Sequence, residues 1–155
     1  MRSAMRKSGL GLLMITAFTA CGGDEDEGPE VRTIQLVERA ASDALVDNEP
    51  PGDSAGDVLT FANLLFDSTN TTQIGTDQGY CVRVVAGESF ECTWTAFLSE
   101  GQLTVSGPFY DTKGSVLAIT GGTGAFQGAG GEMELRFRES QTVEYDFIYR
   151  VVLED

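Results

Sequence analysis

Apolar and polar residues alternate along much of this chain, most clearly near its end. From Val143 to Leu153 the apolar residues fall on almost every second position, and the positions between them include Glu144, Asp146 and Arg150. A period of two is typical of a β-strand with one buried face. Eight segments either alternate in this way or are rich in β-branched and aromatic residues, and turn residues separate them. These predicted strands are Val31–Arg39, Val58–Asp67, Ile74–Val85, Phe90–Leu98, Gln102–Phe109, Ser115–Thr120, Gly131–Arg138 and Val143–Leu153.

The connections between most of these segments are short, and no stretch has the periodicity of a helix. Short connections join antiparallel neighbours, and eight antiparallel strands commonly close into a barrel. We therefore predict an all-β fold, an eight-stranded antiparallel β-barrel. The one long connection, about residues 40–57, contains Pro50-Pro51-Gly52 and is predicted to be a loop. A barrel of eight strands has room for filling side chains or for one small ligand.

The glycine-rich stretch from Gly121 to Gly131 superficially resembles a dinucleotide-binding turn. That motif needs a helix after the glycines, whose N-terminus receives the pyrophosphate. Here Gly122 and Gly124 are followed by Gly128, one residue late, and an alternating strand segment follows the stretch. The glycines are therefore interpreted as a bend between two strands, where the lack of Cβ permits unusual backbone angles.

The composition excludes several classes of function. The chain has 24 acidic residues against 10 basic ones, a net charge of −14, and no histidine. A surface this acidic repels phosphate backbones, so nucleic acid is not an expected partner. Without histidine the chain lacks the commonest general base and the commonest metal ligand, and its three cysteines form no CxxC pair. No metal site is predicted.

The first 30 residues have the features of an export signal followed by a tether. Residues 1–20 have a basic start and an apolar centre, as in a secretory signal peptide. The sequence Phe18-Thr19-Ala20-Cys21 resembles a bacterial lipobox, which predicts lipidation of Cys21, an acidic tether over residues 21–30 and a folded domain over residues 31–155. The expected location is the bacterial cell envelope, periplasmic or extracellular, with a lipid anchor as the only membrane contact. An ordinary signal peptide with a chance cysteine is the alternative.

Four residues are candidates for a site from their positions alone. In the predicted strand Val58–Asp67 the odd positions are apolar apart from Asn63, and Phe61 lies in the same row. A buried amide must be hydrogen-bonded, so Asn63 either faces a ligand or bonds nearby backbone groups. Cys81 and Cys92 stand directly opposite each other in a predicted hairpin. Opposed residues share a face and are close enough for a disulfide, which is the default in an exported protein; a free Cys81 thiol facing a pocket is the alternative.

Several segments resemble the allene oxide cyclases and the related dirigent-like proteins. The matching segments are Gly56–Asp67, Ile74–Val82, Gly107-Pro108-Phe109 and Ala118–Ala129. The resemblance covers about residues 31–153 and implies an eight-stranded antiparallel barrel of the calycin type around a hydrophobic pocket, often assembled as a homotrimer, with no cofactor. The pocket residues that it implies are Asn63, Cys81, Phe90 and Phe109. The plant enzymes of this family cyclise an unstable fatty-acid epoxide.

The first strand departs from the family's pattern. When the chain is aligned on Glu38-Arg39, Gln35 and Val37 occupy the positions of a functional glutamate and asparagine. Neither can replace the missing group, and Glu38 itself would need a shifted register, because consecutive residues of a strand face opposite sides. Two functions therefore stay open. The chain is an isomerase or cyclase that acts on an apolar small molecule in the barrel, or a non-catalytic lipoprotein that binds a hydrophobic ligand or serves as a dirigent-like structural module.

Overall fold

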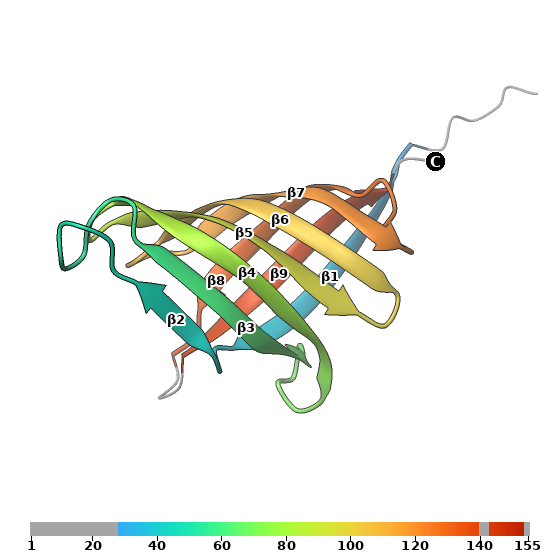
Figure 1. The fold of residues 1–155 in the computed structure, drawn as a ribbon. Helices are drawn as coiled ribbons and strands as arrows, with labels where there is room; N and C mark the ends of the chain where they lie inside the picture. Colours follow the sequence, from blue (N-terminus) through green and yellow to red (C-terminus); the bar gives the residue numbers. More distant parts are fainter. Residues whose placement is uncertain (1–27, 140–142, 154–155) are drawn as a thin grey trace, which may run out of the picture.

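A computed structural model describes residues 28–139 and 143–153 and shows one antiparallel sheet closed into a barrel (Figure 1). The segments assigned to the signal, to Cys21 and to most of the tether lie outside the described residues. The strands are β1 (Glu30–Arg39), β2 (Asp43–Val46), β3 (Val58–Asp67), β4 (Gln73–Val85), β5 (Ser89–Leu98), β6 (Gly101–Tyr110), β7 (Ser115–Gly124), β8 (Gly130–Phe137) and β9 (Glu144–Leu153). The all-β prediction is confirmed, and the described part of the chain holds no helix that could cross a membrane.

Eight of the strands form the barrel wall in the order β1-β9-β8-β7-β6-β5-β4-β3. The first strand closes the barrel, because it pairs with β9 along its whole length and with β3 through Leu36–Arg39. The predicted eight-stranded antiparallel barrel is thus confirmed, with strand ends within one residue of the predicted ones for all strands except β7. That strand continues to Gly124, through the first glycines of the stretch that was expected to be a bend.

The ninth strand, β2, corrects the prediction of an uninterrupted loop over residues 40–57. Asp43–Val46 pairs with Val58–Phe61 at the start of β3, where β1 no longer reaches. All four of its residues are exposed. A strand without a buried face produces no alternation of apolar and polar residues, so the sequence held no signal for it.

Alternate residues of every wall strand fill the interior. The core consists of aliphatic and aromatic side chains from β1 and β3–β9, together with Phe126 from the turn between β7 and β8. That turn lies at one end of the barrel. The other end carries the segment after β1, the turns β4–β5 and β6–β7, the end of β8 and the start of β9, and is called the mouth below (Figure 1). The fully buried Phe126 fills the end away from the mouth.

Candidate functional site

A cavity of about 60 Å³ lies inside the barrel near the mouth. Its wall is mainly apolar and aromatic, and its polar members are Glu38, Asp43 and Asn63. The remaining lining residues are Ala40, Leu59, Phe61, Cys81, Cys92, Trp94, Phe109, Leu135, Tyr145 and Phe147. The aromatic members touch one another: the Trp94 ring stacks on Phe147 at 5.6 Å and meets Phe61 edge-on at 6.0 Å. Apolar walls with a few converging polar groups are the usual character of a small-molecule site.

Asn63 is the centre of the polar wall. Its Oδ1 accepts hydrogen bonds from the backbone N–H groups of Ala41 (2.7 Å) and Ser42 (3.1 Å), the residues that follow β1. Its Nδ2 donates to Glu38 at 2.8 Å and to Asp43 at 3.5 Å. The two alternatives that the sequence left open for Asn63, bonding to backbone and facing a ligand site, therefore both apply. It bonds nearby backbone, and it also presents a fixed amide beside two carboxylates at the cavity.

Glu38 lies inside the barrel, and this corrects the expectation from the alignment of the first strand. Only 5% of the residue is exposed, and it lines the cavity. The register of β1 with β9 and β3 directs Leu36 and Glu38 inward, while Gln35 lines a hollow on the outer surface. The barrel therefore has an inward carboxylate on β1, at a different position from the one that the family pattern indicated.

A second carboxyl is buried beside this site. Asp77 on β4 is the strand partner of Asn63, and only 1% of it is exposed. Neither of its carboxyl oxygens has a hydrogen-bond partner within residues 28–139 and 143–153. Burial raises the pKa of Asp77 to about 7. Burial, and next the charge of Asp77, raise the pKa of Glu38 well above its usual value.

Two tyrosines of β9 share this interior. Burial raises the pKa of the half-buried Tyr145 to about 12, and the charge of Glu38 adds to the effect. The phenol of Tyr149 is fully buried, and burial raises its pKa further still. Both side chains therefore stay neutral near pH 7, and the carboxyls are the groups of the polar wall that can exchange protons there.

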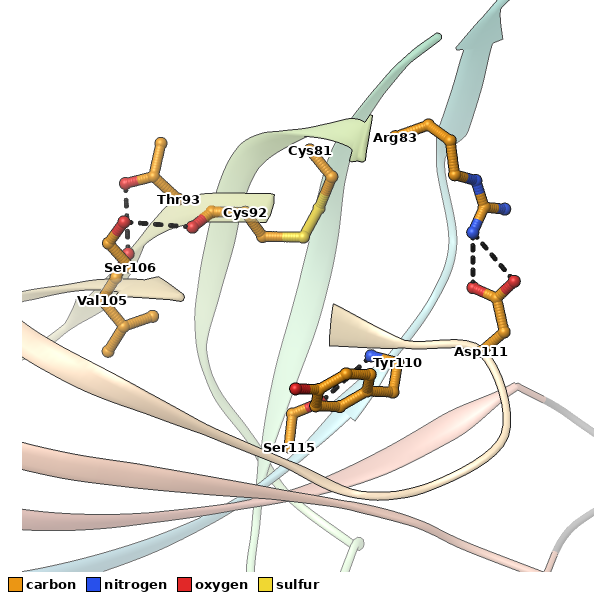
Figure 2. The surroundings of a disulfide bond; sticks show 9 residues. All are labelled: Cys81, Arg83, Cys92, Thr93, Val105, Ser106, Tyr110, Asp111 and Ser115. Carbon is orange, nitrogen blue, oxygen red and sulfur yellow. Dashed lines mark hydrogen bonds and ion pairs between the residues drawn. A yellow bond between two sulfur atoms is a disulfide. The ribbon is translucent and has the colours of Figure 1, made fainter. Parts of the chain in front are cut away.

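Cys81 and Cys92 are joined by a disulfide (Figure 2). They are opposite each other on β4 and β5, as the hairpin register predicted, with their Cα atoms 4.0 Å apart. Both half-cystines line the cavity. In this state Cys81 offers the cavity an apolar wall and no thiolate, so it cannot act as a nucleophile.

The other residues expected in the pocket separate into two groups. Phe61 and Phe109 line the cavity together with Asn63 and Cys81. Phe90 does not: it packs at the rim of the mouth, where the Arg83 guanidinium lies 3.6 Å from the centre of its ring. Trp94, Glu38 and Asp77 are the site residues that sequence reasoning missed or set aside. The register that directs two acids inward is visible only once the strands are paired.

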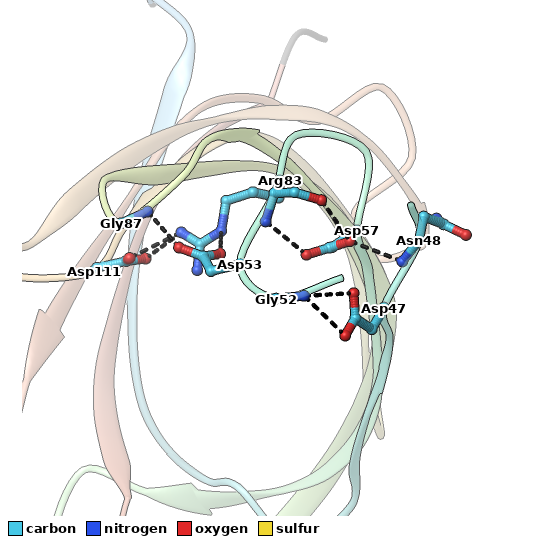
Figure 3. Close-up of polar contacts among 9 residues, drawn as sticks. Asp47, Asn48, Gly52, Asp53, Asp57, Arg83, Gly87 and Asp111 are labelled. Carbon is cyan, nitrogen blue, oxygen red and sulfur yellow. Dashed lines mark hydrogen bonds and ion pairs between the residues drawn. The ribbon is translucent and has the colours of Figure 1, made fainter. Parts of the chain in front are cut away.

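A polar network fixes the rim (Figure 3). Arg83 of β4 donates two hydrogen bonds of 2.8 Å to Asp111 in the turn after β6 and lies 2.7 Å from Asp53. Asp53 in turn accepts a hydrogen bond from the backbone of Gly87. Asp57 accepts hydrogen bonds from the backbone of Asn48 and the backbone of Ser54. The long segment between β2 and β3 is thereby held to β4 and to the β4–β5 turn, and Arg83 links it further to the turn after β6.

Larger hollows exist on the outer surface. One of about 430 Å³ is lined by residues of β3, β4 and β5, such as Thr60, Gln78, Tyr80 and Thr93. It is open, and although Phe61 and Trp94 also border it, no carboxyl is among its lining residues. We therefore regard the inner cavity as the candidate site. Within the described ranges, no group of three or more Cys, Asp or Glu side chains could hold a metal ion.

Comparisons with known proteins place the fold and the family. The family model described as Allene oxide cyclase matches residues 30–151. The chain belongs to the allene oxide cyclase family. Among solved structures, a pyocyanin demethylase is 25% identical, covering 76% of this chain and all of that one, with a TM-score of 0.65.

Two further solved structures show the same fold at lower identity. A pterocarpan synthase dirigent protein is 17% identical over 92% of this chain and 98% of that one, with a TM-score of 0.71. A Diels-Alderase from Streptomyces koyangensis is 15% identical over 83% of this chain and 71% of that one, with a TM-score of 0.64. The same barrel is therefore found in proteins that are named for quite different reactions. The function of this chain has to be inferred from the residues and geometry of its site.

Proposed function

We propose that this chain is an isomerase or cyclase that holds an apolar small molecule in the mouth cavity and directs its rearrangement. The observation that carries the proposal is the cavity itself: an aromatic enclosure with a single polar wall, where Asn63 fixes the buried Glu38. The family membership and the cyclase, Diels-Alderase and dirigent names among the similar structures support a cyclase-like or dirigent role.

The proposed mechanism needs shape first and proton transfer second. Aromatic walls such as Trp94 and Phe147 hold a flexible apolar molecule in one folded conformation, which lowers the entropy cost of ring closure. Excluding water strengthens every polar interaction within the cavity. Glu38, held by Asn63, then stands where a proton can be given to or taken from the bound molecule.

A non-catalytic carrier or dirigent-like module is the second candidate. Two observations favour it: the Cys81–Cys92 disulfide removes a thiol from the chemistry, and the cavity is small. A volume of about 60 Å³ is well below the roughly 300–1,000 Å³ of a typical ligand site. A larger molecule must therefore place only one end in the cavity, with the rest at the mouth, or displace wall side chains.

We also propose that the protein is exported and held at the bacterial envelope through Cys21, with residues 21–30 as a tether, and that it assembles as a homotrimer. The support is the lipobox-like sequence and the family resemblance. Mass determination of the membrane-extracted protein measures the lipid on Cys21, which a Cys21→Ser variant should lack. Native mass spectrometry measures the number of copies.

The ligand test uses native mass spectrometry of the full chain as purified, with two tryptophan substitutions. Leu59→Trp fills the cavity that Leu59 lines, whereas Val116→Trp adds the same bulk at a position that is 53% exposed on the outer wall. We expect a bound apolar molecule in the parent and in Val116→Trp, and its loss in Leu59→Trp. An adduct that persists in Leu59→Trp would place the ligand elsewhere and contradict the proposal.

A further inference from the structure

We propose that Glu38 and Asp77 retain one proton between them, carried by one carboxyl or the other, and form the acid–base centre of the mouth cavity, and that the cavity accepts neutral or cationic molecules and excludes carboxylates. This inference deepens the proposed function and rests on it, because it assigns the chemistry of the same cavity and the class of its ligand.

The two carboxyls meet because three neighbouring strands direct polar side chains into the lumen. Glu38 comes from β1, Asn63 from β3 and Asp77 from β4, with exposed fractions of 5%, 4% and 1%. Asn63 donates to Glu38 at 2.8 Å and is the strand partner of Asp77. The carboxyls are close enough that the charge of Asp77 raises the pKa of Glu38. One amide thus holds one of the carboxyls and lies beside the other.

No basic side chain of the described residues reaches this pair. All seven contact acids, amides or aromatic rings elsewhere. They are Arg32 with Glu100, Arg39 with Asn70 and Glu144, Arg83 with Asp53 and Asp111, Lys113 over Tyr110, Arg136 with Glu134, Arg138 with Asp146, and Arg150 with Glu132.

The remaining titratable groups that face the pair are Asp43 from β2 and the two tyrosines of β9, Tyr145 and Tyr149. Asp43 adds negative charge, and neutral phenols add none. Two ionised carboxylates in this interior would repel each other without a counter-ion and would lose their hydration. Retaining a proton on the pair removes most of that cost, so Glu38 and Asp77 titrate as one unit.

A shared proton suits an isomerisation. When the pair holds one proton, Glu38 facing the ligand can accept a proton from one substrate atom, and the electrons of that broken bond stay on the substrate. The pair then returns a proton to a second substrate atom, where a new bond forms. The substrate and the carboxyls end with the same number of protons and electrons, so the cycle needs no oxidant or reductant.

The same groups determine which ligand charge is tolerated. A ligand carboxylate in the cavity would face Glu38 and Asp43 with no cation to balance it. A protonated amine would face those carboxylates and the rings of Trp94 and Phe61, whose faces attract cations. The net charge of −14 also attracts cations toward the protein. The cavity volume of about 60 Å³ limits the inserted part to a small group.

The first test follows the carboxyl groups directly by ¹³C NMR of the full chain labelled at Asp and Glu carboxyls. Assignments come from Glu38→Gln and Asp77→Asn, and Glu91→Gln on the exposed outer wall of β5 is the control. We expect the apparent pKa of Glu38 to fall in Asp77→Asn, because the opposing charge is gone, and to stay unchanged in Glu91→Gln. Titration of Glu38 that is identical in the parent and in Asp77→Asn would overturn the shared proton.

The second test compares two probes of the same size and opposite charge, benzylamine and benzoate, through the fluorescence of Trp94. Trp94 is the only tryptophan of the chain; it lines the cavity and also borders the outer hollow of β3–β5, so a change in emission that depends on Asp77 is what assigns binding to the cavity. Because burial raises the pKa of Asp77 to about 7, the pair gains negative charge between pH 6 and pH 8, and benzylamine affinity should rise by up to about tenfold over this range, and less in Asp77→Asn. Benzoate binding as tight as that of benzylamine would overturn the ligand class.

These results separate the inference from the proposed function. If Glu38 and Asp77 titrate as a coupled pair in a protein that carries no ligand and catalyses nothing, the acid pair stands and the proposed function is wrong. If a ligand co-purifies with the parent and is absent from Leu59→Trp, but the two carboxyls titrate independently, the ligand site stands and the acid pair is wrong.

Discussion

Asp77→Asn should change how the stability of this protein depends on pH. Only 1% of the parent residue is exposed, and neither carboxyl oxygen has a hydrogen-bond partner among the residues described. Burial raises its pKa from 3.8 to about 7. Asparagine has nearly the same shape but cannot ionise, so the substitution removes the cost of the buried charge and leaves the packing in place.

The sign follows from the direction of the shift. A carboxyl with a raised pKa binds its proton more tightly in the folded state, so the stability it supports is present at low pH and is lost as the pH rises through about 7. The shift of roughly 3 units is worth about 4 kcal/mol in total at about 1.4 kcal/mol per unit. Roughly 2.5 kcal/mol of this falls between pH 5 and pH 8.

The assay is urea unfolding of the parent, Asp77→Asn and the outer-wall control Glu91→Gln at pH 5 and pH 8. From pH 5 to pH 8 the parent should lose about 2–3 kcal/mol more unfolding free energy than Asp77→Asn does. The control should follow the parent. Parallel pH profiles for the parent and Asp77→Asn would mean that Asp77 ionises freely, and the account of the buried carboxyl would be wrong.

Three further substitutions test the mouth. The double variant Cys81→Ser/Cys92→Ser should lose about 3 kcal/mol of stability, because the bridge closes a loop of 12 residues. The unfolded parent should show no free thiol at either position. Full stability of the double variant would contradict this prediction. Arg83→Met leaves Asp53 and Asp111 without their cation and should lower the free energy of unfolding by roughly 3 kcal/mol. The control Arg32→Met, at an exposed ion pair, should lower it by under about 1 kcal/mol. Equal losses in the two variants would count against the rim network. Asn63→Leu leaves Glu38 and two backbone N–H groups without their hydrogen-bond partner and should lower stability by about 2–4 kcal/mol. Proteolysis between β1 and β3 should become faster. Unchanged proteolysis would argue against the role of Asn63 in holding this segment.

The fold was predictable because a barrel strand has one apolar face, so apolar and polar residues alternate along segments such as Val143–Leu153. The opposition of Cys81 and Cys92 followed from a short hairpin, where the turn sets the register. Asn63 was found for a similar reason, as the one amide in an apolar row.

The acid pair was not predictable in the same way. Whether Glu38 faces inward depends on how β1 pairs with β3 and β9, which are far away in the sequence. Asp77 lies between Gly75 and Gly79, where no apolar row marks the inner face of β4. In a chain with 24 acidic residues, two buried ones have no distinguishing local pattern. The strand β2 was missed because it buries no face.

The most direct test of the central claim is the NMR response of two side chains to the co-purified ligand, removed and then added back. The side-chain amide of Asn63 and the ring of Phe109 line the inner cavity and do not border the outer hollow. The account predicts that both signals shift on addition, while the backbone amides of Thr60 and Tyr80 around the outer hollow do not. Shifts confined to that outer hollow, with Asn63 and Phe109 unchanged, would contradict a ligand site inside the barrel.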